Sequence, residues 1–225
     1  MLDLLNKVLV RVQRRIGGIP RGAAHLYDKV AAKYLEPSYD YVVEEVVSKG
    51  ARKILDVGCG PGKLLLEIAE ETDSVILVGL DVSKAMARIA RKNALGKGLY
   101  GAVDFVVADA HKMPLRDNCL DLIVSTGTLH HIRNPREVFS ECTRVLKIGC
   151  EAWIYEFSHD ASWSECSSTA KRLGRLTLLI KVAASLHGLP RKVYREGYVK
   201  EELLKSGVSY KVVYEGAVTK LVLTA

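Results

Sequence analysis

Several features that would assign a protein class at once are missing from this 225-residue sequence. It has five cysteines, an odd number, and no C-x-x-C pair. That pattern argues against a zinc site and favours a reducing compartment over a disulfide-linked secreted domain. The longest helical apolar run, 176–184, contains a threonine and a lysine and is too short to span a membrane. Because the first residues also lack the charge order of a secretory signal, we expect a cytoplasmic location.

Acidic residues are scarce in two parts of the chain. Residues 1–30 hold six Lys or Arg against two Asp, and residues 171–200 hold eight against one Glu. These segments therefore carry +4 and +7, and because the whole chain carries +7, the rest sums to −4. The excess suits an anionic substrate, a membrane surface or a nucleic acid, and solvated surface charge is the alternative interpretation.

The most informative feature that the sequence does contain is a glycine-rich stretch at 54–62. An apolar run surrounds Asp56, glycines follow at positions 58, 60 and 62, and an amphipathic run begins at Leu64. This pattern predicts a strand, a tight turn and a helix, with bare main chain against which a ligand can lie. The dinucleotide pattern G-x-G-x-x-G fails at Lys63, and the P-loop pattern fails at Val57 and Leu64. A turn with no ligand is the alternative.

A second acid occupies a strand end. The apolar run 75–80 stops at Asp81, 19 residues after Gly62. At this distance from a glycine loop, an acid can accept both ribose hydroxyls of an adenosine. Further strands are predicted at 103–108, 120–126 and 152–157, with a polar loop at 111–118 between the first two and a helix at 135–147 between the last two, and then at 208–214 and 218–224. The alternation predicts an α/β fold of the doubly wound, Rossmann-like type.

Three stretches resemble the class I S-adenosylmethionine-dependent methyltransferases. The D-x-G-x-G-x-G pattern at 56–62 resembles their first motif, and 109–117 resembles their third-strand motif. Residues 127–135, with a His-His pair before a proline, resemble the ubiquinone/menaquinone-biosynthesis C-methyltransferases within the small-molecule ("type 11") branch. The resemblance implies a seven-stranded sheet of order 3-2-1-4-5-7-6, with strand 7 antiparallel and helices on both faces. It also implies S-adenosyl-L-methionine as cofactor and S-adenosyl-L-homocysteine as product.

The same resemblance assigns the site residues. The glycine loop would wrap the amino-acid part of the cofactor, Asp81 would hold the ribose, and Asp109 would accept from the adenine amino group, a pairing that suits a carboxylate. Met86 would rest against the adenine, and a core methionine is an equally fair interpretation. The expected cofactor-binding residues are Asp56, Gly58, Cys59, Gly60, Gly62, Asp81, Val82, Met86, Asp109, Ala110 and Thr126.

Tyr27 and His130 are the candidates for catalytic residues. By resemblance, a Tyr-Asp opening helix closes over the cofactor with its tyrosine near the methyl-transfer centre, and an ordinary packing aromatic is the alternative for Tyr27. His130 is a candidate group facing the acceptor, and a structural histidine at a helix start is the alternative. His130 and His131 are adjacent, so they are not a metal pair of the i, i+4 type, and no metal is expected.

The chain is expected to have two parts. Residues 1–35 form amphipathic helices that cap the molecule, and 36–225 form the methyltransferase domain with a basic insert at about 158–197. Within the insert, 171–186 is predicted to be one basic amphipathic helix. This insert and the predicted helix at 2–16 are candidates for a lid, a peripheral membrane contact or ordinary surface.

We therefore predict a methyltransferase acting on a small-molecule or lipid-like acceptor. An anionic group on that acceptor would suit the basic segments. The alternatives are a methyltransferase acting on RNA or protein and a non-catalytic module that binds S-adenosylmethionine. Nucleic acid is not favoured: Thr126-Gly-Thr-Leu replaces the motif of amino-methylating DNA enzymes, and no Pro-Cys nucleophile of cytosine-C5 enzymes occurs. Lys63 disfavours a nicotinamide oxidoreductase.

Overall fold

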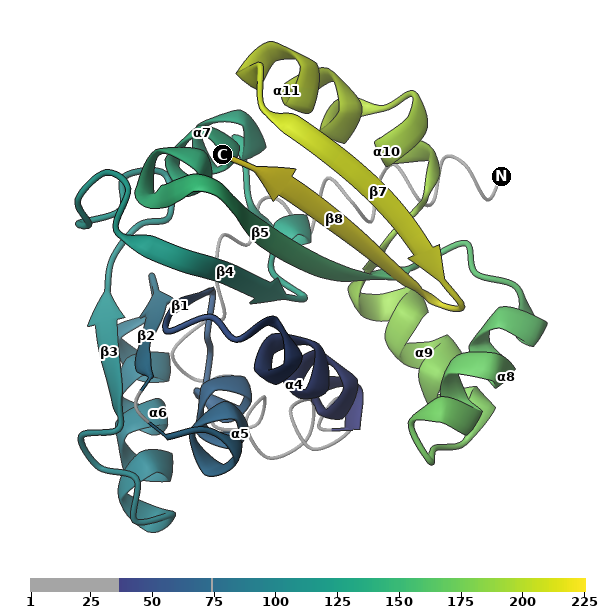
Figure 1. Cartoon of the computed structure of the whole chain (residues 1–225). Helices are drawn as coiled ribbons and strands as arrows, with labels where there is room; N and C mark the ends of the chain where they lie inside the picture. The colour runs from purple at the N-terminus through teal and green to yellow at the C-terminus, as the bar shows by residue number, and fades with distance from the viewer. Residues whose placement is uncertain (1–36, 74) are drawn as a thin grey trace.

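The computed structural model describes residues 37–73 and 75–225 (Figure 1). The amphipathic helix expected at 2–16, the cap expected at 1–35 and the candidate Tyr27 lie outside the described residues. Helices and strands follow one another from residue 37 to the end of the fifth strand, except that a loop alone joins the third strand to the fourth, and a hairpin closes the chain.

A mixed sheet forms the centre of the fold (Figure 1). Its strands run in the order β3-β2-β1-β4-β5-β8-β7, with β1 to β5 parallel and β8 antiparallel to both of its neighbours. The short β6 pairs with the end of β5. The predicted sheet order is confirmed, because β7 and β8 are the sixth and seventh predicted strands and β6 is an addition. The strands are β1 (Lys53–Val57), β2 (Ile76–Asp81), β3 (Val103–Val107), β4 (Leu120–Thr126), β5 (Leu146–Ser158), β6 (Gly188–Leu189), β7 (Ser209–Glu215) and β8 (Val218–Thr224).

Helices cover both faces of this sheet. One core lies beneath α4, α5, α6, α8 and α9, and the other lies beneath α7, α10 and α11. Within the described residues, none of these helices combines the length and the apolar character needed to cross a bilayer. The helices are α4 (Pro37–Lys49), α5 (Lys63–Glu71), α6 (Lys84–Gly96), the 3₁₀ helix η2 (Leu129–His131), α7 (Pro135–Val145), α8 (Trp163–Arg172), α9 (Thr177–His187), α10 (Lys192–Arg195) and α11 (Tyr198–Ser206).

The central strand β4 shows why the sheet strands read as continuous apolar runs. Leu122, Ile123 and Val124 are all fully buried. Leu122 and Val124 point into one core and Ile123 into the other, because successive side chains of a strand leave on opposite faces. A strand covered by helices on both faces is therefore apolar through its centre, whereas the polar residues of β4, Asp121, Ser125 and Thr126, lie toward its ends.

Two elements differ from the sequence prediction. The single helix predicted at 171–186 is wrong: the segment is divided between α8 and α9, because Gly174 takes a left-handed conformation with φ of +61° and ends the first helix. The fifth strand begins at Leu146 and not at 152. Its first residues pair irregularly with β4, and Gly149 has φ of +76° there, so a left-handed residue lies inside the extended strand.

Candidate functional site

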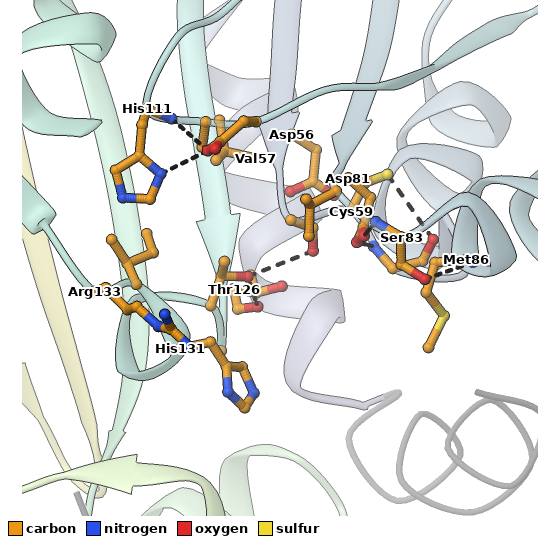
Figure 2. A pocket seen from close by; sticks show the side chains of 18 of the residues that line it. Asp56, Val57, Cys59, Asp81, Ser83, Met86, His111, Thr126, His131 and Arg133 are labelled. Atoms are coloured by element: carbon orange, nitrogen blue, oxygen red, sulfur yellow. Dashed lines mark hydrogen bonds and ion pairs between the residues drawn. The ribbon is translucent and has the colours of Figure 1, made fainter. Parts of the chain in front are cut away.

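A cavity of about 600 Å³ opens at the carboxyl ends of β1, β2 and β4 (Figure 2). This edge is where open α/β sheets bind ligands, because the loops that leave neighbouring parallel strands diverge there. Its lining comes from the glycine loop, the ends of β2 and β3, and the segment from β4 to the start of α7. The lining residues are Asp56, Val57, Gly58, Cys59, Gly60, Pro61, Leu64, Asp81, Val82, Ser83, Met86, Asp109, Ala110, His111, Thr126, Gly127, Thr128, His131, Ile132, Arg133, Asn134 and Glu137.

Two hydrogen bonds fix the glycine loop against β2. The backbone N–H groups of Gly58 and Cys59 both donate to the carbonyl of Leu80, at 2.7 and 3.1 Å. Gly60 has φ of +51°, and a methyl group built on it would meet no atom within 4 Å. A methyl group built on Gly62 would instead lie 2.7 Å from the ring of Phe105. Gly60 thus leaves open space at the loop, whereas Gly62 allows close packing of α5 on the sheet.

The carboxylate of Asp81 is held in a fixed orientation beside this loop. Its Oδ2 accepts from the backbone N–H of Gly60 at 2.9 Å, and its Oδ1 accepts from that of Ser83 at 2.7 Å. Burial raises the pKa of Asp81, and the two N–H groups partly offset that effect. The Ser83 side chain accepts from the N–H of Met86 and caps α6, which places Met86 in the cavity wall.

Asp56 is a buried acid in the wall of the cavity. Its side chain lines the cavity, yet the residue is only 2% exposed. Among the described residues, its Oδ1 has no hydrogen-bond partner. Burial, and secondarily the charge of Asp81, raise the pKa of Asp56 to about 8. Burial likewise raises the pKa of the neighbouring Cys59 thiol, which disfavours a reactive thiolate.

Asp109 and His111 form a pair at the edge of the cavity beyond β3. Asp109 Oδ1 accepts from the His111 backbone N–H at 2.9 Å and lies 2.6 Å from Nδ1 of the same ring. The hydrogen bonds from His111 lower the pKa of Asp109, so the carboxylate stays ionised near neutral pH. Figure 2 shows the His111 ring on this side of the site. The sequence analysis did not single out His111.

The His-His pair divides between the core and the cavity. His130 is 1% exposed and does not line the cavity; its Nδ1 lies 2.9 Å from Oε2 of the buried Glu156. His131 lines the cavity, and its ring centroid lies 4.0 Å from that of His130. Figure 2 shows His131 and Arg133 across the site from Asp81 and Met86. The sequence analysis missed His131 and Arg133, although the adjacency of the two histidines already implied that they point differently.

The predicted site residues therefore separate into three groups. Gly62 and His130 lie outside the cavity lining, and Tyr27 lies outside the described residues. Among the residues that the structure describes, no group of three or more His, Cys, Asp or Glu could hold a metal ion. The predicted residues that do line the cavity are Asp56, Gly58, Cys59, Gly60, Asp81, Val82, Met86, Asp109, Ala110 and Thr126.

Comparison with known proteins identifies similar chains. Residues 55–154 match the family described as a methyltransferase domain. The chain is 34% identical over 176 residues to a malonyl-[acyl-carrier protein] O-methyltransferase from Geobacter sulfurreducens, covering 76% of this chain and 58% of that one. It is 31% identical over 121 residues to a ubiquinone/menaquinone biosynthesis C-methyltransferase from Stutzerimonas stutzeri, covering 52% and 46%. The chain spans about half the length of the curated relatives it matches.

Solved structures with the same fold agree with these relatives. An S-adenosylmethionine-dependent methyltransferase from Aquifex aeolicus has a TM-score of 0.65 at 20% identity, covering 92% of this chain and 98% of that one. The plantazolicin methyltransferase BpumL, solved with S-adenosylhomocysteine, has a TM-score of 0.64 at 14% identity, covering 100% and 99%. The family resemblance inferred from the sequence is confirmed. Residues 55–154 of this chain match the methyltransferase-domain family, and the described residues have the fold of solved S-adenosylmethionine-dependent methyltransferases.

Proposed function

We propose that this chain is an S-adenosylmethionine-dependent methyltransferase that acts on a small-molecule or lipid-like acceptor in the cavity. The observation that carries the proposal is the buried Asp56 Oδ1, which has no hydrogen-bond partner among the described residues. A buried polar atom without a partner is destabilising by roughly 1–3 kcal/mol, so its retention at a cavity wall favours a ligand that completes it. The amino-acid end of the cofactor carries an ammonium group, which is a suitable partner for that oxygen.

The neighbouring residues fit the rest of the same ligand. Gly60 leaves space for the amino-acid part at the bare loop. Each oxygen of Asp81 accepts one backbone N–H and keeps a lone pair, so the carboxylate can also accept the ribose hydroxyls. Asp109, ionised and at the outer edge, is placed to accept from the adenine amino group. The remaining residues proposed to line the cofactor site are Gly58, Cys59, Val82, Met86, Ala110 and Thr126.

The acceptor would bind on the opposite side of the cavity. His131, Arg133 and Glu137 give this side hydrogen-bonding groups of both charges. When bound, the cofactor supplies a methyl group on a positively charged sulfur, which is activated for in-line displacement. The residues of the chain then have to orient the acceptor and exclude water, and orientation alone provides much of the rate. We assign His131 to contact the acceptor, and His130 with Glu156 to fix the orientation of His131.

The domain boundaries and location extend this proposal. Residues 36–225 would form one catalytic domain that includes the insert at about 158–197. All five cysteines lie within the described residues and are free thiols, which supports a cytoplasmic location.

Removing the Asp81 carboxylate is expected to weaken binding of S-adenosylmethionine by about 1–3 kcal/mol, because the ribose hydroxyls lose their acceptor. Titration calorimetry on Asp81→Ala measures this loss. Asp104→Ala is the matched control, because Asp104 is an exposed acid of β3 outside the cavity. Equal affinities of the two variants would remove Asp81 from the site.

Transfer of a labelled methyl group from S-adenosylmethionine tests the function itself. The purified chain is incubated with a cell extract, which is then separated into lipid, small-molecule, RNA and protein fractions. Label is expected in the lipid or small-molecule fraction, and His131→Ala should reduce the rate of labelling without changing cofactor affinity. Label confined to RNA or protein would contradict the acceptor class. Cofactor binding without any methyl transfer would contradict the proposal that the protein is an enzyme.

A further inference from the structure

The α8–α9 segment is strongly basic and lies at one end of the molecule. Figure 1 shows α8 and α9 side by side, away from α5 and α6. From Glu165 to the end of α9 the sequence contains no further acid and four Lys or Arg, three of them at the turn between the two helices. An uninterrupted positive segment of this kind attracts an anionic partner.

Exposed aliphatic side chains lie within the same segment. Leu176 is 71% exposed, Leu178 61% and Val182 45%. Leu178 and Val182 are four residues apart and so share a side of α9. The other side of that helix is used by the core, where Ile180 is 3% exposed and Ala184 is fully buried. The fold therefore does not need the exposed leucines, and it presents them to solvent together.

The cations of the segment have two different roles. Arg172 forms an ion pair with Glu215 at 3.2 Å, and Lys181 donates to the carbonyl of Ala161 at 2.5 Å, so these two hold the fold together. Lys171 and Arg175 are exposed and make no ion pair with any described residue. We call Lys171, Arg175, Leu176, Leu178 and Val182 the α9 surface.

We propose that the α9 surface docks the protein on an anionic phospholipid bilayer. Charge complementarity selects a negative partner, and the exposed aliphatic groups select one with an apolar interior beneath its charges. A second copy of the chain would bring the same positive charges together. A nucleic acid would pair with Lys171 and Arg175 but would leave the leucines in water. Docking of this kind goes beyond the proposed methyl transfer and does not require it.

Co-sedimentation of the full chain with vesicles tests the proposal. Binding is expected to vesicles of phosphatidylglycerol mixed with phosphatidylcholine, and much more weakly to vesicles of phosphatidylcholine alone. Lys171→Gln with Arg175→Gln should weaken binding about 25-fold, at about fivefold per charge. Leu176→Ser with Leu178→Ser should weaken it at least about tenfold. Serine is a favourable residue at the helix N-cap that Leu176 occupies, so the fold should be retained.

The matched control is Leu95→Ser with Leu204→Ser, which makes the same change at two leucines that are 65% and 63% exposed on α6 and α11. This control should bind vesicles as the wild-type protein does. Equal loss in the control would show that general hydrophobicity, and not the α9 surface, determines binding. Loss only when the charges are removed would indicate purely electrostatic attachment, with no use of the exposed leucines, and would overturn the proposal. So would failure of the wild-type chain to bind the anionic vesicles.

Discussion

Without cofactor, the Asp56→Asn variant is expected to unfold with a larger free energy than the wild-type protein above pH 8. The pKa of Asp56 is raised from 3.8 to about 8 in the folded protein. The folded state therefore binds more protons than the unfolded state between these values, and the wild-type protein loses stability as pH rises through them. Asparagine does not titrate. The difference in unfolding free energy between the variant and the wild-type protein should grow from about pH 4 to pH 8 and then remain constant. It should reach up to about 5 kcal/mol, because the pKa shift is about four units.

Denaturant unfolding across this pH range measures the difference. Asp121→Asn is the comparison variant, for which the pH dependence of stability has the opposite sign. The hydrogen bond from Lys147 lowers the pKa of Asp121, so the stabilisation by the Asp121 carboxylate is present above its ordinary pKa and is lost as pH falls. The Asp56→Asn variant should also bind S-adenosylmethionine at least about tenfold more weakly, because the ammonium group of the ligand loses a carboxylate of opposite charge and keeps only a neutral acceptor. If its stability advantage did not change with pH, Asp56 would not be a buried, uncompensated acid.

Replacing Gly60 by valine is expected to abolish cofactor binding, with an affinity loss of more than about 100-fold. The new side chain enters the open space at the glycine loop, where no protein atom lies within 4 Å. It therefore competes with the ligand and not with the core. The left-handed φ of +51° adds strain of about 1–2 kcal/mol for any residue with a Cβ, which lowers stability without preventing folding. Calorimetric titration with S-adenosylmethionine measures the loss.

Gly98→Val is the matched control for this variant. Gly98 also has a positive φ, of +74°, and no atom within 4 Å of an added methyl group, but it follows α6 and does not line the cavity. Both variants should lose similar stability in thermal unfolding, and only Gly60→Val should lose the cofactor. Tight binding by Gly60→Val would mean that the ligand does not lie against the loop.

Features of the fold and the site that depend on the local sequence pattern could be predicted from the sequence. The glycine spacing and the acids at two strand ends predicted a crevice, and Asp56, Asp81 and Asp109 all line the observed cavity. The sheet order followed from the family resemblance. Regular apolar runs are informative here because a parallel sheet buries its strands on both faces.

Features that depend on distant neighbours were not predicted. The buried position of His130 is fixed by Glu156, which lies 26 residues away on β5, whereas the half-buried His131 lines the cavity. The missing partner of Asp56 Oδ1 is a property of the packed site and has no sequence signal. Gly174 divides the basic helix because a single left-handed residue outweighs the periodicity of the surrounding sequence.

A crystal structure of the full chain with S-adenosyl-L-homocysteine tests the central claim most directly. We predict the ammonium group of the ligand within hydrogen-bond distance of Asp56 Oδ1, and the ribose hydroxyls on Asp81. An ordered ligand that leaves Asp56 unpaired, or that binds away from the glycine loop, would contradict the account.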